Sequence, residues 1–307
     1  MRHFLDLKDF STDTLQGILN EAMRMKTHMK QFGQHEQPLA GKTVAMIFEK
    51  PSTRTRVSFE VGIIQLGGSP LVLSANDLQL GRGESIEDTA RVLSRYVDAI
   101  MIRCFSHDML LGLANHASIP VINALTERSH PCQLMADLMT MIEYHGALAD
   151  QSVAWVGDGN NMANTWLQAA QLLDFKVNVS TPSGYEVDEG LARVKGKDIR
   201  VHYQTFSNPL DACREADLVT TDVWTSMGFE AENEARKQAF SAWCVDEEMM
   251  GVAKKNALFM HCLPAHRGEE VSAEVIDGPQ SVVWDEAENR MHVQKALMEY
   301  LLLGMQH

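Results

Sequence analysis

At residues 48–56 the chain reads Phe48-Glu49-Lys50-Pro51-Ser52-Thr53-Arg54-Thr55-Arg56. The apolar run 44–48 is typical of a buried strand, and the residues that follow, as far as the Gly-Gly pair at 67–68, have the pattern of a helix. Ser52 is the expected N-cap of that helix. The stretch therefore predicts a strand that turns directly into a helix.

The start of this helix is well suited to bind a phosphate. The first backbone N–H groups of a helix lack intrahelical acceptors and lie at the positive end of its dipole. Thr53 and Thr55 add two hydroxyls, and Arg54 and Arg56 add two guanidiniums. The alternative is a capped core helix whose arginines face water. A Walker loop is excluded because the glycines and the GK[ST] ending are missing.

Composition limits the possible partners and the compartment. The chain has 307 residues, 45% of them hydrophobic, and a formal net charge of −14, which argues against nucleic acid or an anionic membrane as a partner. No apolar leader or membrane span is present in the sequence. Five cysteines without a CxxC pair indicate free thiols in a reducing compartment. We therefore expect a cytoplasmic protein.

Strand-like and helix-like segments alternate along the whole chain, which predicts an α/β fold with mostly parallel sheets. The strands of the first half are expected at 44–48, 71–73, 99–103 and 119–122. Those of the second half are expected at 153–156, 177–180, 199–203, 218–223, 257–261 and 281–284. We expect two domains with a cleft between them, residues 1–146 joined by a final helix at 289–307, and residues 147–288. Ligands should bind outside the carboxyl ends of the strands.

Polar residues follow several of these strands. Arg103 ends a strand and suits a phosphate or a carbonyl oxygen, and His130 and Gln133 lie at the start of a Met-rich helix. Asp222 ends another strand and suits an ammonium group. Taken singly, each has an ordinary interpretation: a salt bridge for Arg103, a capping or core role for His130, and a helix cap for Asp222.

Two further strand ends carry chemistry-bearing residues. Gly157-Asp-Gly-Asn-Asn161 begins like a dinucleotide fingerprint, but Met162 replaces the third glycine and the acidic residue about twenty positions on is absent. Asn161 suits a substrate carboxylate instead. His261-Cys-Leu-Pro264 is too sparse for a zinc site, and a nucleophilic Cys262 would require a base beside it.

Together these motifs are specific. Ser-Thr-Arg-Thr-Arg at 52–56, His-Pro-Cys-Gln at 130–133, Asp222 with Ser-Met-Gly at 226–228, and His-Cys-Leu-Pro at 261–264 stand in the order seen in carbamoyltransferases. Over essentially its whole length the chain resembles the ornithine carbamoyltransferases. The resemblance implies transfer of the carbamoyl group of carbamoyl phosphate to the δ-amino group of L-ornithine, giving L-citrulline and phosphate. It also implies a homotrimer with active sites at subunit borders, and neither a cofactor nor a metal.

The resemblance also implies roles for individual residues. The catalytic set would be Arg103, His130 and Cys262. The carbamoyl-phosphate site would comprise Ser52, Thr53, Arg54, Thr55, Gln79 from a neighbouring subunit, Arg103, His130, Gln133, the carbonyl of Leu263, and Arg290. The ornithine site would comprise Asn161, Asp222, Ser226, Met227 and Cys262.

Three alternatives remain at this stage. In the first, the acceptor is a related amine such as putrescine or N-acetylornithine, because relatives with those substrates share most of the motifs. In the second, the turn at 157–161 belongs to a nicotinamide-dependent dehydrogenase. In the third, the chain is an inactive paralogue that serves as a binding partner.

Overall fold

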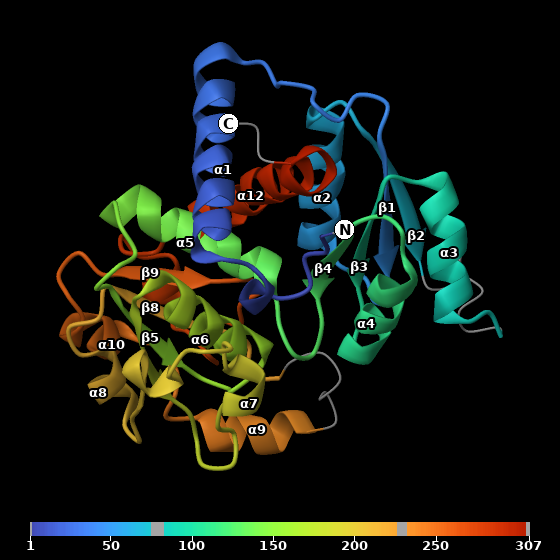
Figure 1. The fold of residues 1–307 in the computed structure, drawn as a ribbon. Helices are drawn as coiled ribbons and strands as arrows, with labels where there is room; N and C mark the ends of the chain where they lie inside the picture. Colours follow the sequence, from blue (N-terminus) through green and yellow to red (C-terminus); the bar gives the residue numbers. More distant parts are fainter. Residues whose placement is uncertain (1, 75–82, 226–231, 305–307) are drawn as a thin grey trace. The chain divides into compact units, whose positions relative to one another are not determined.

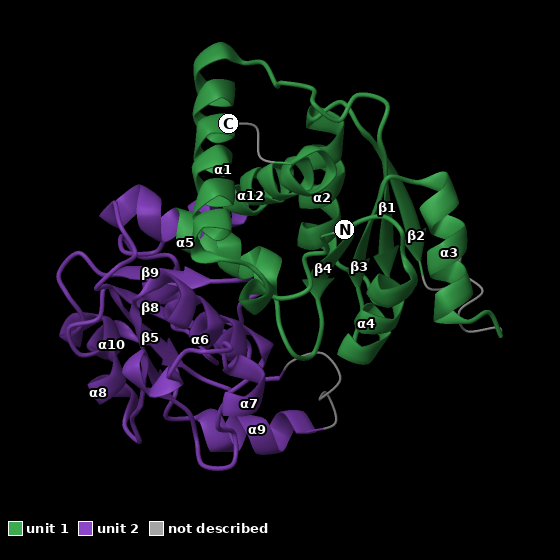
Figure 2. Ribbon diagram, in the orientation of Figure 1, with its two compact units in different colours: residues 1–139, 288–307 green, residues 140–287 purple. Residues whose placement is uncertain are grey.

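The computed structural model describes residues 2–74, 83–225 and 232–304. The chain forms two compact units, Met1–Met139 with Glu288–His307, and Thr140–Ala287 (Figure 2). It passes between them inside two helices, α5 (Pro131–His145) and α12 (Val283–Leu303) (Figure 1). The paired strands of both units run parallel, which confirms the predicted α/β class.

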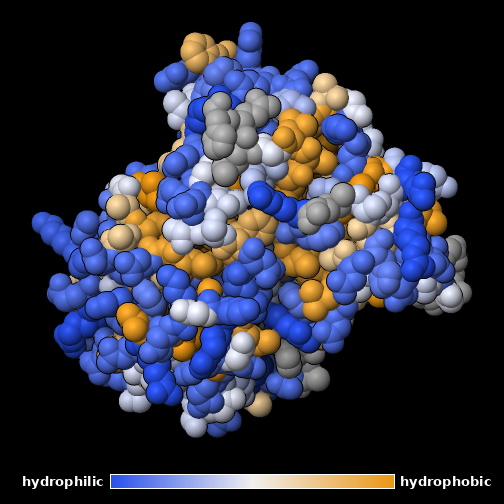
Figure 3. Space-filling view, viewed as in Figure 1, coloured by the Kyte–Doolittle hydropathy of each residue, from blue (hydrophilic) through white to orange (hydrophobic). Residues whose placement is uncertain are grey.

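Figure 3 shows charged and polar side chains over much of one face, with apolar patches between them. Among the residues that the structure describes, no helix is both long and apolar enough to cross a membrane.

The first unit is built on a four-stranded sheet with the order β2-β1-β3-β4. Its strands are β1 (Thr43–Phe48), β2 (Ser69–Ser74), β3 (Ala99–Arg103) and β4 (Val121–Leu125). Its helices, besides parts of α5 and α12, are η1 (Leu7–Asp9), α1 (Thr12–Phe32), α2 (Thr53–Gln65), α3 (Ile86–Tyr96) and α4 (His107–His116). From β1 the chain moves outward to β2 and then returns to β3, so that the sheet reverses its winding between β1 and β3.

Local chemistry explains why these helices begin where they do. The hydroxyls of Ser11, Ser85 and Ser106 each accept a hydrogen bond from a first-turn amide of α1, α3 and α4. Helices α3 and α4 then pack their apolar faces on one side of the sheet (Figure 1), where Leu93 and Leu110 join Ile47 in one buried cluster.

The second unit contains a five-stranded sheet with the order β7-β6-β5-β8-β9. Its strands are β5 (Ser152–Val156), β6 (Lys176–Ser180), β7 (Tyr203–Thr205), β8 (Leu218–Thr221) and β9 (Leu258–His261). Its helices are α6 (Asn161–Leu173), α7 (Glu189–Ala192), η3 (Ile199–Val201), α8 (Pro209–Cys213), α9 (Asn233–Phe240), α10 (Glu247–Val252) and α11 (Ala273–Ile276). Here the winding reverses between β5 and β8.

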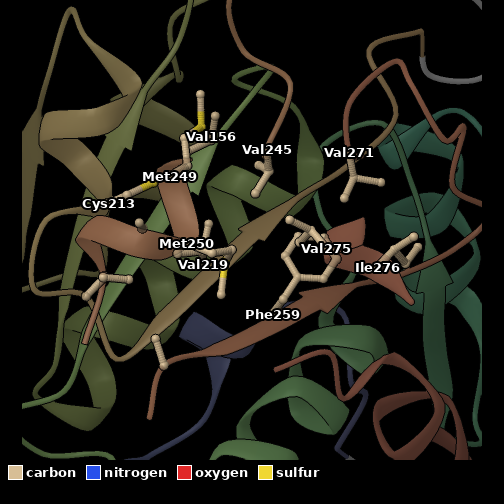
Figure 4. Close-up of a cluster of buried hydrophobic side chains, with 14 of the residues drawn as sticks. Val156, Cys213, Val219, Val245, Met249, Met250, Phe259, Val271, Val275 and Ile276 are labelled. Atoms are coloured by element: carbon tan, nitrogen blue, oxygen red, sulfur yellow. The ribbon is translucent and has the colours of Figure 1, made fainter. Parts of the chain in front are cut away.

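One face of this sheet is closed by short helices. Val219 and Phe259 of neighbouring strands pack against Met249 and Met250 of α10 and Val275 of α11 (Figure 4). The side chains of this cluster are nearly all withdrawn from water, so they form an apolar core on this side of the sheet.

Two expected strands are wrong. Residues 199–203 begin as the 3₁₀-helix η3, because the Asp198 side chain accepts from the amide of Arg200, and strand β7 starts only at Tyr203. Residues 281–284 form a single bridge, Ser281 with Phe259, before α12 begins at Val283. Acidic residues in the first turn of α12 favour a helix start there.

Candidate active site

Both reversals of winding coincide with motifs. In open parallel sheets, ligands bind outside the carboxyl ends of the strands at the point where the winding reverses. In the first unit this point lies between β1, which is followed by the segment 49–56, and β3, which ends at Arg103. In the second unit it lies between β5 and β8, followed by 157–161 and Asp222.

In the first unit, two arginines meet at one hydroxyl. The Nη1 of Arg103, at the end of β3, lies 3.2 Å from Thr55 Oγ1 and donates to it. The Nη2 of Arg290 donates to the same oxygen at 2.9 Å. Thr55 is 1% exposed and Arg290 is 4% exposed. Two guanidiniums in a largely dehydrated place are well suited to bind an anion.

The first turn of α2 completes this positive region. Ser52 is the N-cap residue, and its hydroxyl makes no capping hydrogen bond to its own helix. Thr53 is exposed and Arg54 is half-buried. Arg56 instead faces outward and pairs with Glu60 at 3.2 Å, so it does not join the anion site.

His130 lies at the same place and is neutral. Burial, together with the charges of Arg290 and Arg103, holds the pKa of His130 well below its usual range. A neutral imidazole can present an N–H donor without adding a third positive charge. The state of His130 therefore suits hydrogen bonding rather than a charge interaction.

The neighbouring residues of the motif have different roles. Gln133 is buried, and its amide donates to Asp137 at 2.8 Å, which orients it along α5. Burial raises the pKa of the Cys132 thiol to about 12, and its Sγ donates to the carbonyl of Asn123. Cys132 is therefore a core residue and no nucleophile.

In the second unit, Asp222 is the centre of a hydrogen-bond network. It is 8% exposed. Its Oδ2 accepts from the Asn160 amide at 2.8 Å, and its Oδ1 accepts from the Cys262 thiol at 3.2 Å and from the amide of Val223 at 2.8 Å. The structure thus brings together Asp222 and Cys262, both candidates for the acceptor site, and adds Asn160.

The turn after β5 is not built for a dinucleotide. Asn160 caps α6, and its Oδ1 accepts from the amides of Met162 and Ala163 at 2.9 and 3.2 Å. In a dinucleotide site such amides would be available to the pyrophosphate. A Cβ on Gly159 would lie 2.4 Å from the backbone carbon of Glu186, so the 185–187 segment packs directly on the turn. Asn161 is half-buried at the first position of α6.

In the His-Cys-Leu-Pro motif, His261 fixes the backbone conformation at Leu263. The Nδ1 of His261 accepts from the amide of Leu263 at 2.9 Å, and its Nε2 lies 3.3 Å from Glu270. Leu263 has a φ of +56°, a conformation uncommon for a side-chain-bearing residue, and its peptide bond to Pro264 is cis. The contacts of His261 thus hold the Leu263 backbone in an unusual conformation.

Potential metal ligands were also found near this motif. Ligand atoms of Asp222, His261 and Cys262 lie within 4.8 Å of one another. Both ring nitrogens of His261 already face Leu263 and Glu270, and the Cys262 thiol donates to Asp222. This donor set is organised by internal hydrogen bonds and does not fit a metal centre.

Sequence reasoning missed one buried ion pair. Arg236 of α9 pairs with Asp158, which follows β5. The pKa of Asp158 is raised to about 6. Burial is the largest cause, the charge of Arg236 partly offsets it, and the charge of Asp222 adds to the rise. The only sequence signal was Asp158 within the glycine-rich turn, because nothing distinguishes Arg236 from a surface arginine on a polar helix.

Some expected residues are placed differently or lie beyond what is described. Gln79, Ser226 and Met227 lie outside the described residues. Arg290 does not open the last helix as expected, because α12 begins at Val283 and Arg290 lies inside it. Of the described carbamoyl-phosphate candidates, Leu263 belongs to the second unit and the others belong to the first.

Comparison with known proteins gives a consistent result along the whole chain. Residues 2–143 match the family model of the aspartate/ornithine carbamoyltransferase carbamoyl-P binding domain, and residues 149–301 match that of the Asp/Orn binding domain. An ornithine carbamoyltransferase of Paracidovorax citrulli is 63% identical over 304 residues, which cover 99% of this chain and 97% of that one.

Solved structures agree. An ornithine carbamoyltransferase from Burkholderia thailandensis has 55% identity and a TM-score of 0.91, with 100% of each chain covered. The enzyme from Pyrococcus furiosus has 48% identity and a TM-score of 0.93, covering 99% of this chain and 98% of that one. The chain therefore belongs to the aspartate/ornithine carbamoyltransferase family.

Proposed function

We propose that this chain is an ornithine carbamoyltransferase, which transfers the carbamoyl group of carbamoyl phosphate to the δ-amine of L-ornithine and releases L-citrulline and phosphate. The observation that carries the proposal is the meeting of Arg103 and Arg290 at Thr55, beside a neutral His130. Relatives 60% and 63% identical over nearly the whole chain bear that name.

The first unit suits carbamoyl phosphate. In this proposal, Ser52, Thr53, Arg54 and Thr55 bind the phosphate, because α2 begins there with amides directed outward. Arg103 and His130 donate to the carbamoyl oxygen. Attack by the amine places negative charge on that oxygen, and donors aimed at it lower the barrier.

Three other residues would complete this site. Gln133 and the carbonyl of Leu263 would receive the carbamoyl NH₂ group. Gln79 would come from a neighbouring subunit.

The second unit suits the amino-acid end of ornithine. Asp222 is a buried carboxylate held by three donors, and it can accept from the α-ammonium group. Asn161 would bind the α-carboxylate with Ser226 and Met227, and Cys262 would lie near the δ-amine. This arrangement favours an acceptor with a free amino-acid end over putrescine or N-acetylornithine.

The reaction needs no redox step. The neutral δ-amine forms a bond to the carbamoyl carbon, the bond from that carbon to the phosphate oxygen breaks, and the proton lost by the amine passes to the departing phosphate. The protein supplies orientation and electrostatic stabilisation through its own donors. We also propose a cytoplasmic location, because all five cysteines, which lie within the described residues, are free thiols.

The decisive test is citrulline formation from carbamoyl phosphate by the purified protein. Ornithine, putrescine, N-acetylornithine and aspartate serve as parallel acceptors. We expect strong turnover with ornithine alone. Turnover with another acceptor would contradict the assignment of Asp222 to an α-ammonium, and no turnover with any acceptor would favour an inactive paralogue.

Replacing Arg103 by Met should lower kcat by about a hundredfold or more, because it removes a donor to the developing oxyanion. Arg128→Met is the matched control: Arg128 belongs to the same unit, is partly exposed and pairs with Asp108 at 2.9 Å. It should change kcat by less than about twofold. Equal effects of both substitutions in steady-state assays would contradict the role of Arg103.

The pH dependence of the activity should reflect the δ-amine of ornithine, because His130 does not change its charge over the tested range. Because the pKa of His130 is lowered well below 6.5, the imidazole is neutral above that lowered pKa and has no titration left between pH 7 and 8.5. The δ-amine, with a pKa of about 10.4 by analogy with lysine, becomes increasingly neutral as the pH rises. We expect activity at saturating substrates to climb from pH 7 to 8.5. A flat or falling profile would count against this account.

We further propose that the chain forms a homotrimer and that α2 contributes to the interface. Val57, Val61 and Ile64, at helical spacing, are 53%, 37% and 56% exposed. A stripe of large apolar side chains on a surface helix favours contact with another protein. Family resemblance supports a second and third copy of this chain as the partners.

Replacing Ile64 by Glu should therefore dissociate or weaken the trimer, because a charge would be buried at the interface. The control is Val201→Glu, at a 63% exposed position of the second unit. Light scattering after size-exclusion chromatography would measure the mass. A wild-type monomer, or equal masses for both variants, would overturn the proposal.

A further inference from the structure

Arg236 is a buried arginine that the proposed reaction does not use. Although it lies on the polar helix α9, it is only 4% exposed. Its guanidinium pairs with Asp158, and its Nε donates to the carbonyl of Trp224 at 2.6 Å. It also lies over the rings of Tyr185 and Phe240, at 4.8 and 5.5 Å from their centroids. Withdrawing an arginine so far from water is costly unless its donors are satisfied.

The partners of Arg236 belong to the two segments that carry Asn161 and Asp222, which are proposed to bind the acceptor amino acid. Asp158 lies in the turn after β5, two residues before Asn160, and Trp224 lies two residues after Asp222, which follows β8. Asn160 and Asp222 are themselves hydrogen-bonded at 2.8 Å. Arg236 thus closes a ring of contacts that runs through both segments at the point where the sheet reverses its winding.

We propose that Arg236 is a positioning residue for the acceptor amino acid, which sets the placement of Asp222 and Asn160 by tying Asp158 to the Trp224 carbonyl. The inference rests on the proposed function. Arg236 touches neither substrate in this scheme. It acts through the two segments that it joins.

Charge gives a second reason for an arginine at this place. Asp158 and Asp222 are two carboxylates close enough to influence each other. The acceptor brings an α-carboxylate together with its α-ammonium, so one compensated and one available carboxylate match it better than two available ones. Arg236 provides that compensation for Asp158, and Asp222 remains for the ammonium group.

The pair also predicts how binding depends on pH. Asp158 faces Arg236 from α9 and Asp222 from the end of β8. The guanidinium of Arg236 also lies 3.6 Å from Glu232 and over the Tyr185 ring. Asp222 in turn accepts a hydrogen bond from the Cys262 thiol. The pKa of Asp158, raised to about 6, means that the ion pair is intact above that pH and is lost as the pH falls through it.

The first experiment compares KM values. Arg236→Met should raise the KM for ornithine by at least about tenfold, with the KM for carbamoyl phosphate changed by less than about twofold. The matched control is Lys254→Met. Lys254 pairs at 2.8 Å with Asp217, which immediately precedes β8, whereas Asp222 follows the other end of that strand. It should lower the melting temperature without changing either KM.

The second experiment uses a near-isosteric change that should preserve the fold. L-Norvaline has the amino-acid end of ornithine but no δ-amine, so its inhibition constant at saturating carbamoyl phosphate reports the acceptor site alone. In the wild type, we expect inhibition to weaken as the pH falls from 7.5 to 5.5. In Asp158→Asn it should be independent of pH over this range.

The outcomes separate this inference from the proposed function. If the wild type makes no citrulline from ornithine, the proposed function fails. If the wild type is active but Arg236→Met raises both KM values equally, or lowers only the melting temperature, the positioning role of Arg236 is overturned. The same pH dependence in Asp158→Asn as in the wild type would also overturn it.

Discussion

The parallel pairing of β1 with β3, and of β5 with β8, is the constraint on which the site residues depend. Parallel strands end at the same edge of a sheet, so residues that follow them meet although they are far apart in the chain. Arg103 reaches Thr55 in this way, and Asp222 reaches Asn160. The two units solve the same topological problem with different chemistry, one with cations and one with carboxylates.

In the first unit, the local environment opposes the charge of the whole chain. The formal net charge is −14, yet two guanidiniums converge on one buried hydroxyl. Dehydrating two cations is costly, so such a place suits an anion, such as the phosphate group of the proposed substrate, better than a neutral ligand. Burial and the charges of these cations hold the pKa of His130 low, so the imidazole is neutral at a position where a third positive charge would be unfavourable.

In the second unit, carboxylates are controlled by their donors. Asp222 accepts from Asn160, Cys262 and the Val223 amide, and Asp158 is compensated by Arg236. The unusual backbone at Leu263 is likewise held by a side chain, that of His261. Such connected polar networks specify one geometry, because each member left without its partner would be costly to bury.

The sequence by itself determined the features that depend on neighbouring residues. The strand before Ser52, the position of Ser52 as an N-cap residue, and the alternation of strands and helices were predictable because propensity and helix-start preferences act over a few residues. The motifs likewise singled out Arg103, His130, Asp222 and Cys262 as candidates for the site.

Only the tertiary structure decided features that depend on contacts between distant segments. It showed that α12 begins at Val283 where a strand was expected, and that Asn160, next to the expected Asn161, binds Asp222. It also showed that Arg236 is buried against Asp158. All three features depend on long-range packing, which local sequence patterns do not encode. They are the start of α12, the contact made by Asn160 rather than Asn161, and the burial of Arg236.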